Sequence, residues 1–351
     1  MNKKSIYAVV AAFSLTAFTG FAVAQTTASN TSTPAGKIAA SQPSQSAGIA
    51  NVTVSQTSVA SAVGVSNAVS SISSGQGGYY SGLDVKRYAL TGDTGVAGAP
   101  ATSLWNVWTA YSHSNIGYSF SQLQSSGNVN VFLAGVDYTL PYNVIVGVAV
   151  ATDNTSVNLN FSGGTMSGNG TTVSPYFGVA INKNLSMDGT IGYGRTNVST
   201  NALGVAGSTS SDRSVGTLGL TYVEKINDWT LSARGAYLNV SDQLGAYTLS
   251  NGTLVTSGSV RVSQLRLTGQ AAYTFGAISP FASVTLIDDL NAPNQAPVNG
   301  IAAANARTAW TPAIGVRFKA DNSVYGAIQY SSEQRTEVKN NQIMLNLGIR
   351  F

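Results

Sequence analysis

The chain has 351 residues, no cysteine and a formal net charge of +4, and only 9% of its residues are charged, against about 25% in an ordinary soluble domain. The absence of cysteine excludes disulfides, and so small a charge excess does not give the basic surface typical of nucleic-acid-binding proteins. Low charge together with 37 glycines and 16 tyrosines indicates a chain rich in β-structure.

The N-terminal residues have the pattern of an export signal. Lys3 and Lys4 precede an apolar run over 6–21, and Ala22-Val23-Ala24 has the small residues of a signal peptidase site. We therefore expect residues 1–24 to be a signal peptide that is removed, which leaves a net charge of 4 − 2 = +2. A retained membrane anchor is the alternative, and the short apolar run does not favour it.

Residues 25–76 are rich in Ser, Thr, Ala and Gln, and we expect a low-complexity segment without a core. Within it, apolar residues recur at spacings of three and four, at Val59, Ala62, Val65, Val69 and Ile72. This spacing predicts a weakly amphipathic helix over 54–73 that could enter a pore. A flexible tether is the alternative, because Ser and Val are poor helix formers. A Gly-rich linker follows over 77–103.

From residue 104 to 351 the chain alternates apolar and polar residues in segments of about ten, the period-2 signal of membrane β-strands. We expect twelve strands, an even number as in single-chain outer-membrane barrels. They lie near 104–113, 129–138, 144–153, 172–181, 185–195, 213–223, 229–241, 260–275, 279–288, 308–319, 323–332 and 342–351.

The connections between these strands alternate between short and long. Short ones are turn-forming sequences such as "LPYN", "NKN" and "KADN", whereas long ones are polar, such as "NTSVNLNFSGGTMSGNG". Every short turn then lies at one end of the sheet, as in outer-membrane barrels. A soluble sandwich has no reason to sort its loops in this way. We therefore predict an all-β fold, a closed antiparallel transmembrane barrel of about twelve strands.

One face of each predicted strand is apolar and would face lipid, and the other is polar and would face the interior. The charges on the inner face are Asp137, Asp188, Arg234, Arg266, Arg317 and Arg350. Their excess of arginine predicts a mildly positive lumen. Two explanations remain open: a pore that prefers anions, or a network that hydrogen-bonds itself and a plug.

Aromatic residues on the lipid-facing side fall at strand ends, where they would form two interfacial girdles. At the short-turn end these are Trp105, Tyr138, Tyr222, Trp229, Tyr273, Phe318 and Phe351. At the long-loop end they are Tyr111, Tyr193, Tyr237, Trp310 and Tyr330. A mere preference of aromatics for strands would scatter them along the strand instead.

The final segment, "QIMLNLGIRF", keeps the strand period up to its last residue. Its lipid-facing residues are Ile343, Leu345, Leu347, Ile349 and Phe351. Because a closed barrel pairs its last strand with its first, we expect this strand to pair with 104–113.

Four stretches resemble the C-terminal translocator β-domain of autotransporters, the type V secretion family: "SLWNVWTAYSHS", "LAGVDYTLPYNVIVGVAVA", "VSPYFGVAINKNLSMDGTIGYG" and "LNLGIRF". The resemblance covers about 104–351. It implies a twelve-stranded barrel in the outer membrane of a Gram-negative bacterium, with a linker helix through the pore. It also implies export of upstream sequence, helped by a barrel assembly machinery that recognises the terminal strand ending in Phe351. Members usually carry a long passenger, whereas here only 25–76 is available.

The expected partners are outer-membrane lipid and lipopolysaccharide, the barrel assembly machinery and periplasmic chaperones, with no nucleic acid, cofactor or metal. We expect a monomeric barrel and no enzyme, because His113 is the single histidine and no nucleophile elbow or phosphate-binding loop is present. Our hypothesis is that the barrel exports or displays its N-terminal segment, with the long loops extracellular. The alternative is a non-secreting barrel that acts as a narrow pore or a loop-borne adhesin.

Overall fold

A computed structural model describes the helix and most of the predicted strand region. The described residues are 42–74, 105–119, 124–140, 144–160, 163–202, 204–291, 306–320, 324–336 and 338–351, with helix side chains from Thr57 onward. The predicted signal peptide over 1–24 and the linker over 77–103 lie outside these residues.

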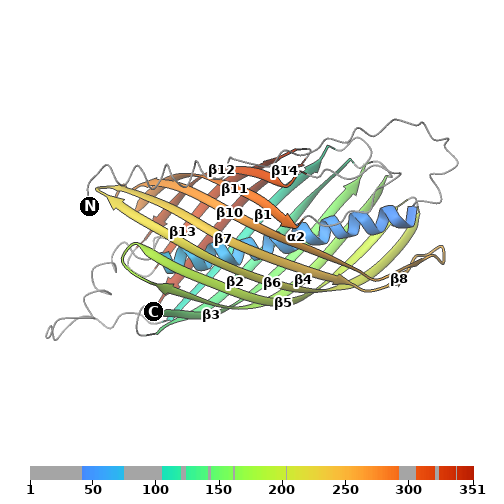
Figure 1. Cartoon of the computed structure of the whole chain (residues 1–351), viewed down its shortest axis with the longest axis horizontal. Helices are drawn as coiled ribbons and strands as arrows, with labels where there is room; N and C mark the ends of the chain where they lie inside the picture. The colour runs from blue at the N-terminus through green and yellow to red at the C-terminus, as the bar shows by residue number, and fades with distance from the viewer. Residues whose placement is uncertain are drawn as a thin grey trace. The chain divides into compact units, whose positions relative to one another are not determined.

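Twelve long strands form one closed antiparallel barrel, in which each strand pairs with its neighbours in the chain and the last pairs with the first (Figure 1). They are β1 (Trp105–Tyr118), β2 (Ser125–Leu140), β3 (Val144–Leu159), β4 (Gly164–Ala180), β5 (Leu185–Ala202), β6 (Val205–Ile226), β7 (Trp229–Leu244), β10 (Gly258–Tyr273), β11 (Ile278–Asn291), β12 (Thr308–Lys319), β13 (Val324–Arg335) and β14 (Val338–Arg350). A small hairpin of β8 (Tyr247–Thr248) and β9 (Leu254–Val255) interrupts the connection from β7 to β10. The predicted closed barrel of twelve strands is confirmed.

The seam of the barrel joins β1 to β14. The ladder runs from Asn106 opposite Arg350 to Tyr118 opposite Val338. It is completed by Trp105 and Phe351, which exchange two backbone hydrogen bonds of 3.1 Å. The last strand therefore has no free edge, as the sequence predicts.

The strands extend further toward the long loops than predicted. Most of "NTSVNLNFSGGTMSGNG" is not a loop but the paired ends of β3 and β4, with Val157 opposite Met166. The polarity of the two faces is also reversed there, because Asn154 and Asn158 are exposed whereas Val157 and Leu159 are buried inside. An outer face that is polar at this level is expected where the strands leave the hydrocarbon and enter water.

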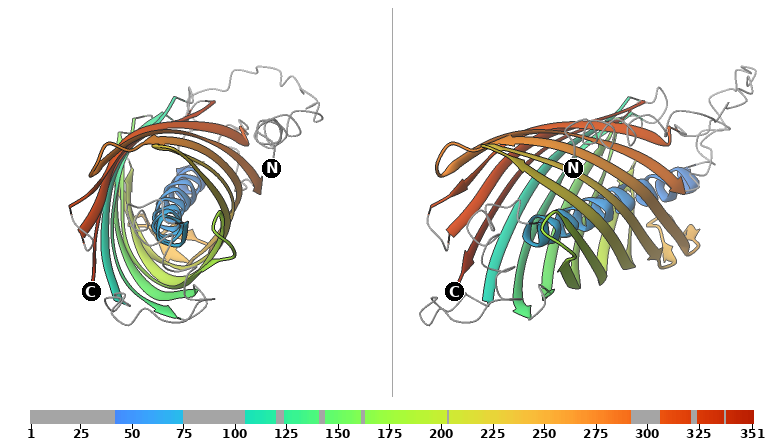
Figure 2. Two further views of the ribbon diagram at one scale, coloured as in Figure 1. Left: turned by 90° about the vertical axis from the view of Figure 1, so that its left-hand side faces the viewer. Right: turned by 60° about the vertical axis from the view of Figure 1, so that its left-hand side comes forward.

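The helix α2 (Gln42–Ser74) lies inside the barrel, surrounded by strands in the end-on view of Figure 2. It is longer than the predicted helix over 54–73 and replaces the alternative of a flexible tether. Among the described residues, no helix is both long enough and apolar enough to span a membrane.

Candidate functional site: the helix-filled lumen

One side of α2 packs on an apolar wall. The buried stripe of the helix consists of Val65, Val69 and Ile72, at spacings of four and three, and each is no more than 2% exposed. These side chains belong to one apolar cluster with side chains of β1 to β4. The wall residues include Trp108, Leu133, Ile145 and Tyr176. The prediction of a uniformly polar inner face is therefore wrong on this side of the barrel, because an apolar helix stripe is buried against it.

Two glycines let α2 approach this wall closely. A Cβ atom at Gly178 of β4 would lie 2.7 Å from the Cβ atom of Ser73, and one at Gly64 would lie 3.2 Å from Cδ1 of Leu133. The helix itself is rich in Ser, Ala and Val in this region. A glycine on each surface, Gly64 on α2 and Gly178 on β4, thus allows a close fit.

Polar contacts to α2 follow the helix from one mouth of the barrel to the other. The Thr57 and Thr155 hydroxyls lie 2.6 Å apart, near the long-loop end of β3. Ser61 donates to Asp153 over 3.3 Å. Ser70 and Thr221 lie 3.1 Å apart between their hydroxyls. The helix therefore runs from the long-loop end at Thr57 toward the short-turn end, where Ser73 meets Gly178.

A bidentate ion pair adds a charged contact in the middle of the helix. Arg234 of β7 donates to both carboxylate oxygens of Asp188, over 2.5 Å and 2.9 Å. Its Nη2 also donates to the Ser66 hydroxyl of α2 over 2.9 Å. Asp188 is fully buried, so this arginine compensates a carboxylate that water does not reach.

Asp137 lies in a second polar group near the short-turn end of the lumen. It accepts hydrogen bonds from Asn106 over 2.7 Å and from the Tyr176 hydroxyl over 3.0 Å. The indole of Trp108 donates to the same hydroxyl over 2.8 Å. These bonds stabilise an aspartate that is only 2% exposed.

The most deeply buried charged group was missed by the sequence analysis. Arg213 of β6 pairs with Asp153 over 2.5 Å and with Asp242 over 3.3 Å, and all three side chains are at most 1% exposed. The signal was available, since Arg213 shares the inner face of its strand with Thr217 and Thr221. Because Arg213 is the first residue of the predicted strand over 213–223, the inner-face rule applied to the whole of that strand finds it.

The remaining predicted inner charges, Arg266, Arg317 and Arg350, are all partly buried. Arg266 donates to Gln264 over 3.0 Å, and Arg317 donates to Gln270. Near the long-loop mouth, Arg335 pairs with Asp289 and Glu333, a further group that the sequence analysis missed.

The predicted girdle residues lie on the outer surface. Those that are exposed are Trp105, Tyr111, Tyr193, Tyr222, Trp229, Tyr237, Trp310, Tyr330 and Phe351. Tyr138 and Tyr273 are half-buried because they pack edge-to-face against Trp105 and Trp229, and Phe318 is half-buried beside Gly326. Ile343, Leu345, Leu347 and Ile349 are also exposed on the outside. Their contact with lipid stays a prediction.

His113 lies on the outer side of β1, away from the lumen charges. Its Nδ1 is 2.7 Å from Oδ1 of Asn130, which also accepts a hydrogen bond of 2.9 Å from Tyr111.

The model of the autotransporter beta-domain family matches residues 106–331, which span most of the barrel. The chain belongs to this family. It is an outer-membrane translocator barrel of a Gram-negative bacterium, and autotransporter β-domains are transport barrels rather than enzymes.

Solved autotransporter structures have the same fold. The translocator domain of the autotransporter NalP from Neisseria meningitidis matches with a TM-score of 0.60 at 12% identity, covering 80% of this chain and 99% of that one. The beta domain of the Bordetella autotransporter BrkA matches with a TM-score of 0.60 at 14% identity, covering 71% and 100%. No curated protein is similar enough in sequence to be counted as a relative.

Proposed function

We propose that this barrel exports its own N-terminal segment and displays it at the cell surface. The observation that carries the proposal is the direction of α2 in the lumen. Thr57 contacts β3 near the long-loop mouth, whereas Ser73 lies beside Gly178 at the short-turn end. The N-terminal end of α2 thus points toward the long-loop mouth, which in this proposal is the cell exterior.

The size of the seated helix supports this function. The distance from residue 57 to residue 73 along an α-helix is about 24 Å, at 1.5 Å per residue. This length matches the apolar band of an outer-membrane barrel, which is about 25 Å tall. The polar contacts at Ser61, Ser66 and Ser70 are spread over that length and would hold the helix after export.

The final strand fits a role in assembly. In the proposal, periplasmic chaperones deliver the chain, and the barrel assembly machinery recognises β14 and Phe351 before closing the seam on β1. The exposed residues of β14 then contact outer-membrane lipid and lipopolysaccharide.

The absence of cysteine from the chain allows a direct test of topology. Three variants each carry one cysteine. Thr31→Cys lies before the helix in the sequence, Asn251→Cys lies in a long loop, and Asp228→Cys lies in the short turn between β6 and β7. In intact cells, a membrane-impermeant maleimide should label the first two variants and leave the third unlabelled until the outer membrane is opened.

Protection of the Thr31→Cys variant in correctly assembled barrels would contradict surface display. In that case the alternative of a non-secreting pore or adhesin would be favoured. Labelling of Asp228→Cys in intact cells would instead show that the proposed orientation is inverted.

A further inference from the structure

The barrel wall extends further toward the long loops on some strands than on others. β4, β5 and β6 contain 17, 18 and 22 residues, whereas β12 and β13 contain 12 each. β5 continues from the predicted girdle residue Tyr193 to Ala202, whereas β12 begins at Thr308, just before the girdle residue Trp310. The long strands therefore present an outer surface beyond the girdle that β12 lacks.

Side chains on this outer surface form rows of identical residues across β3, β4 and β5. In the first row, Asn154 is opposite Asn169, which is opposite Asn197. A row of serines follows toward the long loops in the same register, and all residues of both rows are exposed. We call these two rows the amide-hydroxyl face; its six residues are Asn154, Asn169, Asn197, Ser156, Ser167 and Ser199.

The surroundings of the amide-hydroxyl face keep it free of net charge. The next row toward the loops, Asn158, Thr165 and Asn201, is also exposed and uncharged. On the membrane side, Arg195 and Asp212 lie opposite each other on β5 and β6, so their charges are of opposite sign and adjacent. The face itself contains no charged, aliphatic or aromatic side chain.

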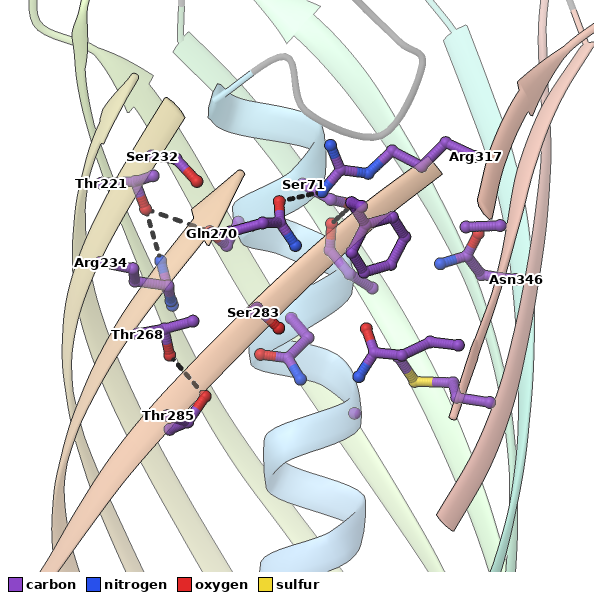
Figure 3. Close-up of a pocket in the computed structure, with 18 of the residues that line it drawn as sticks. Ser71, Thr221, Ser232, Arg234, Thr268, Gln270, Ser283, Thr285, Arg317 and Asn346 are labelled. Carbon is purple, nitrogen blue, oxygen red and sulfur yellow. Dashed lines mark hydrogen bonds between the residues drawn. The ribbon is translucent and has the colours of Figure 1, made fainter. Parts of the chain in front are cut away.

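The polar groups of the face are available to a ligand. None of its six side chains makes a hydrogen bond with a residue that the structure describes. Hydroxyls inside the lumen differ, because they bond to one another, as between Thr268 and Thr285 over 2.9 Å (Figure 3). Neighbouring strands are about 4.8 Å apart, so the face is a regular array of donors and acceptors directed outward.

The composition of the face favours one class of ligand. Anionic headgroups are bound by clusters of Lys and Arg, and protein interfaces have an apolar or aromatic centre, but the face has neither. Its strands are paired on both edges, so no edge is open to an added strand. The hydroxyls of neutral sugars both donate and accept hydrogen bonds, as do the amides and hydroxyls of the face.

We propose that the amide-hydroxyl face binds neutral sugars of lipopolysaccharide, the glycolipid of the outer leaflet. Asn197 follows the girdle residue Tyr193 by four residues, about 14 Å along the strand, so the face lies beyond the apolar band and continues the membrane-facing surface. Sugars attached to the lipid anchor occupy this level. The inference rests on the proposed orientation, in which the long loops are extracellular.

Binding to the purified full chain in detergent tests the proposal, and it does not depend on the orientation in cells. Native mass spectrometry compares lipopolysaccharide that carries its complete core saccharide with lipid A, which has the acyl chains and no core sugars. The parent chain should bind lipopolysaccharide at least tenfold more tightly than lipid A. Asn154→Ala/Asn169→Ala/Asn197→Ala should remove this difference and leave binding of lipid A unchanged.

The control is Thr248→Ala/Ser259→Ala/Thr308→Ala, which removes three exposed hydroxyls outside the face. It should bind lipopolysaccharide as the parent chain does. Heat-modifiable migration on gels shows whether each variant folds. Should the triple asparagine variant not fold, Asn169→Ala alone should weaken lipopolysaccharide binding at least twofold, and unchanged binding in that variant overturns the proposal.

Three further results would also overturn it. The first is equal affinity of the parent chain for lipopolysaccharide and lipid A. The second is a triple asparagine variant that folds and binds lipopolysaccharide as tightly as the parent chain, or no more weakly than the control. The third is a dimer of the parent chain that the triple asparagine variant abolishes, because a second copy would then occupy the face. Failure of the proposed orientation shows instead in the maleimide labelling of intact cells.

Discussion

Arg234 of β7 connects the barrel wall to the helix, because the same guanidinium pairs with Asp188 and donates to Ser66 of α2. The pair is therefore part of the wall and of the contact surface for α2. Asp188 is fully buried, and among the residues that the structure describes Arg234 is its one ion-pair partner.

Arg234→Gln should destabilise the barrel by about 3–5 kcal/mol, the usual cost of leaving one partner of a buried ion pair uncompensated. Ser66→Ala removes only one hydrogen bond of the same guanidinium, and its expected cost is about 1 kcal/mol. The measurement is the urea concentration at which the folded, fast-migrating form is lost. Equal effects of the two substitutions would contradict this account of Asp188.

Deletion of Phe351 should lower insertion into the outer membrane, since it removes the two hydrogen bonds to Trp105 together with the ring. Phe351→Ala keeps the backbone bonds and should have a smaller effect. The amount of heat-modifiable barrel in outer-membrane fractions measures insertion.

Phe275→Ala is the matched control for that ring, because Phe275 and Phe351 are both 65% exposed, whereas Phe275 is not part of the seam. Normal insertion of the truncated chain would exclude Phe351 from assembly.

Gly178→Ala should loosen the C-terminal part of α2, because the new Cβ atom would lie 2.7 Å from Cβ of Ser73. Ion conductance through the barrel in planar bilayers is expected to rise, and insertion should be unchanged. Gly216→Ala is the control, since a Cβ atom there meets nothing within 4 Å. Unchanged conductance in Gly178→Ala would show that this contact does not hold the helix.

The barrel could be predicted from the sequence because strand period, turn chemistry and loop lengths all agree over 104–351. The tight turns carry their own signal, such as Asn227 with φ of 54° and Gly276 with φ of 56°. Strand ends could not be predicted as well. The strands continue beyond the apolar band, and there the polar residues face outward and the apolar ones inward, as at Asn158 and Val157. A rule that requires apolar residues on the outer face therefore ends each strand too early.

The interior was harder to predict, because the residue pattern of a strand does not show what its inner face contacts. Leu133 and Ile145 point inward against α2, which only the placement of the helix explains. Asp188 and Arg234 were both predicted to face the lumen, but their pairing depends on strand register across β5, β6 and β7. Arg213 was missed because it lies at the border between predicted strand and predicted loop.

The position of α2 in the lumen is the central claim, and a disulfide between helix and wall tests it most directly. Thr57 and Thr155 approach to 2.6 Å between their hydroxyl oxygens, and the parent chain has no cysteine to compete. The Thr57→Cys/Thr155→Cys double variant should form a cross-link in outer membranes, seen as a shift in non-reducing gels. The control pairs Thr57→Cys with Thr221→Cys, whose native neighbour is Ser70, and it should stay uncross-linked. A cross-link in the control and none in the first variant would contradict the proposed direction of the helix.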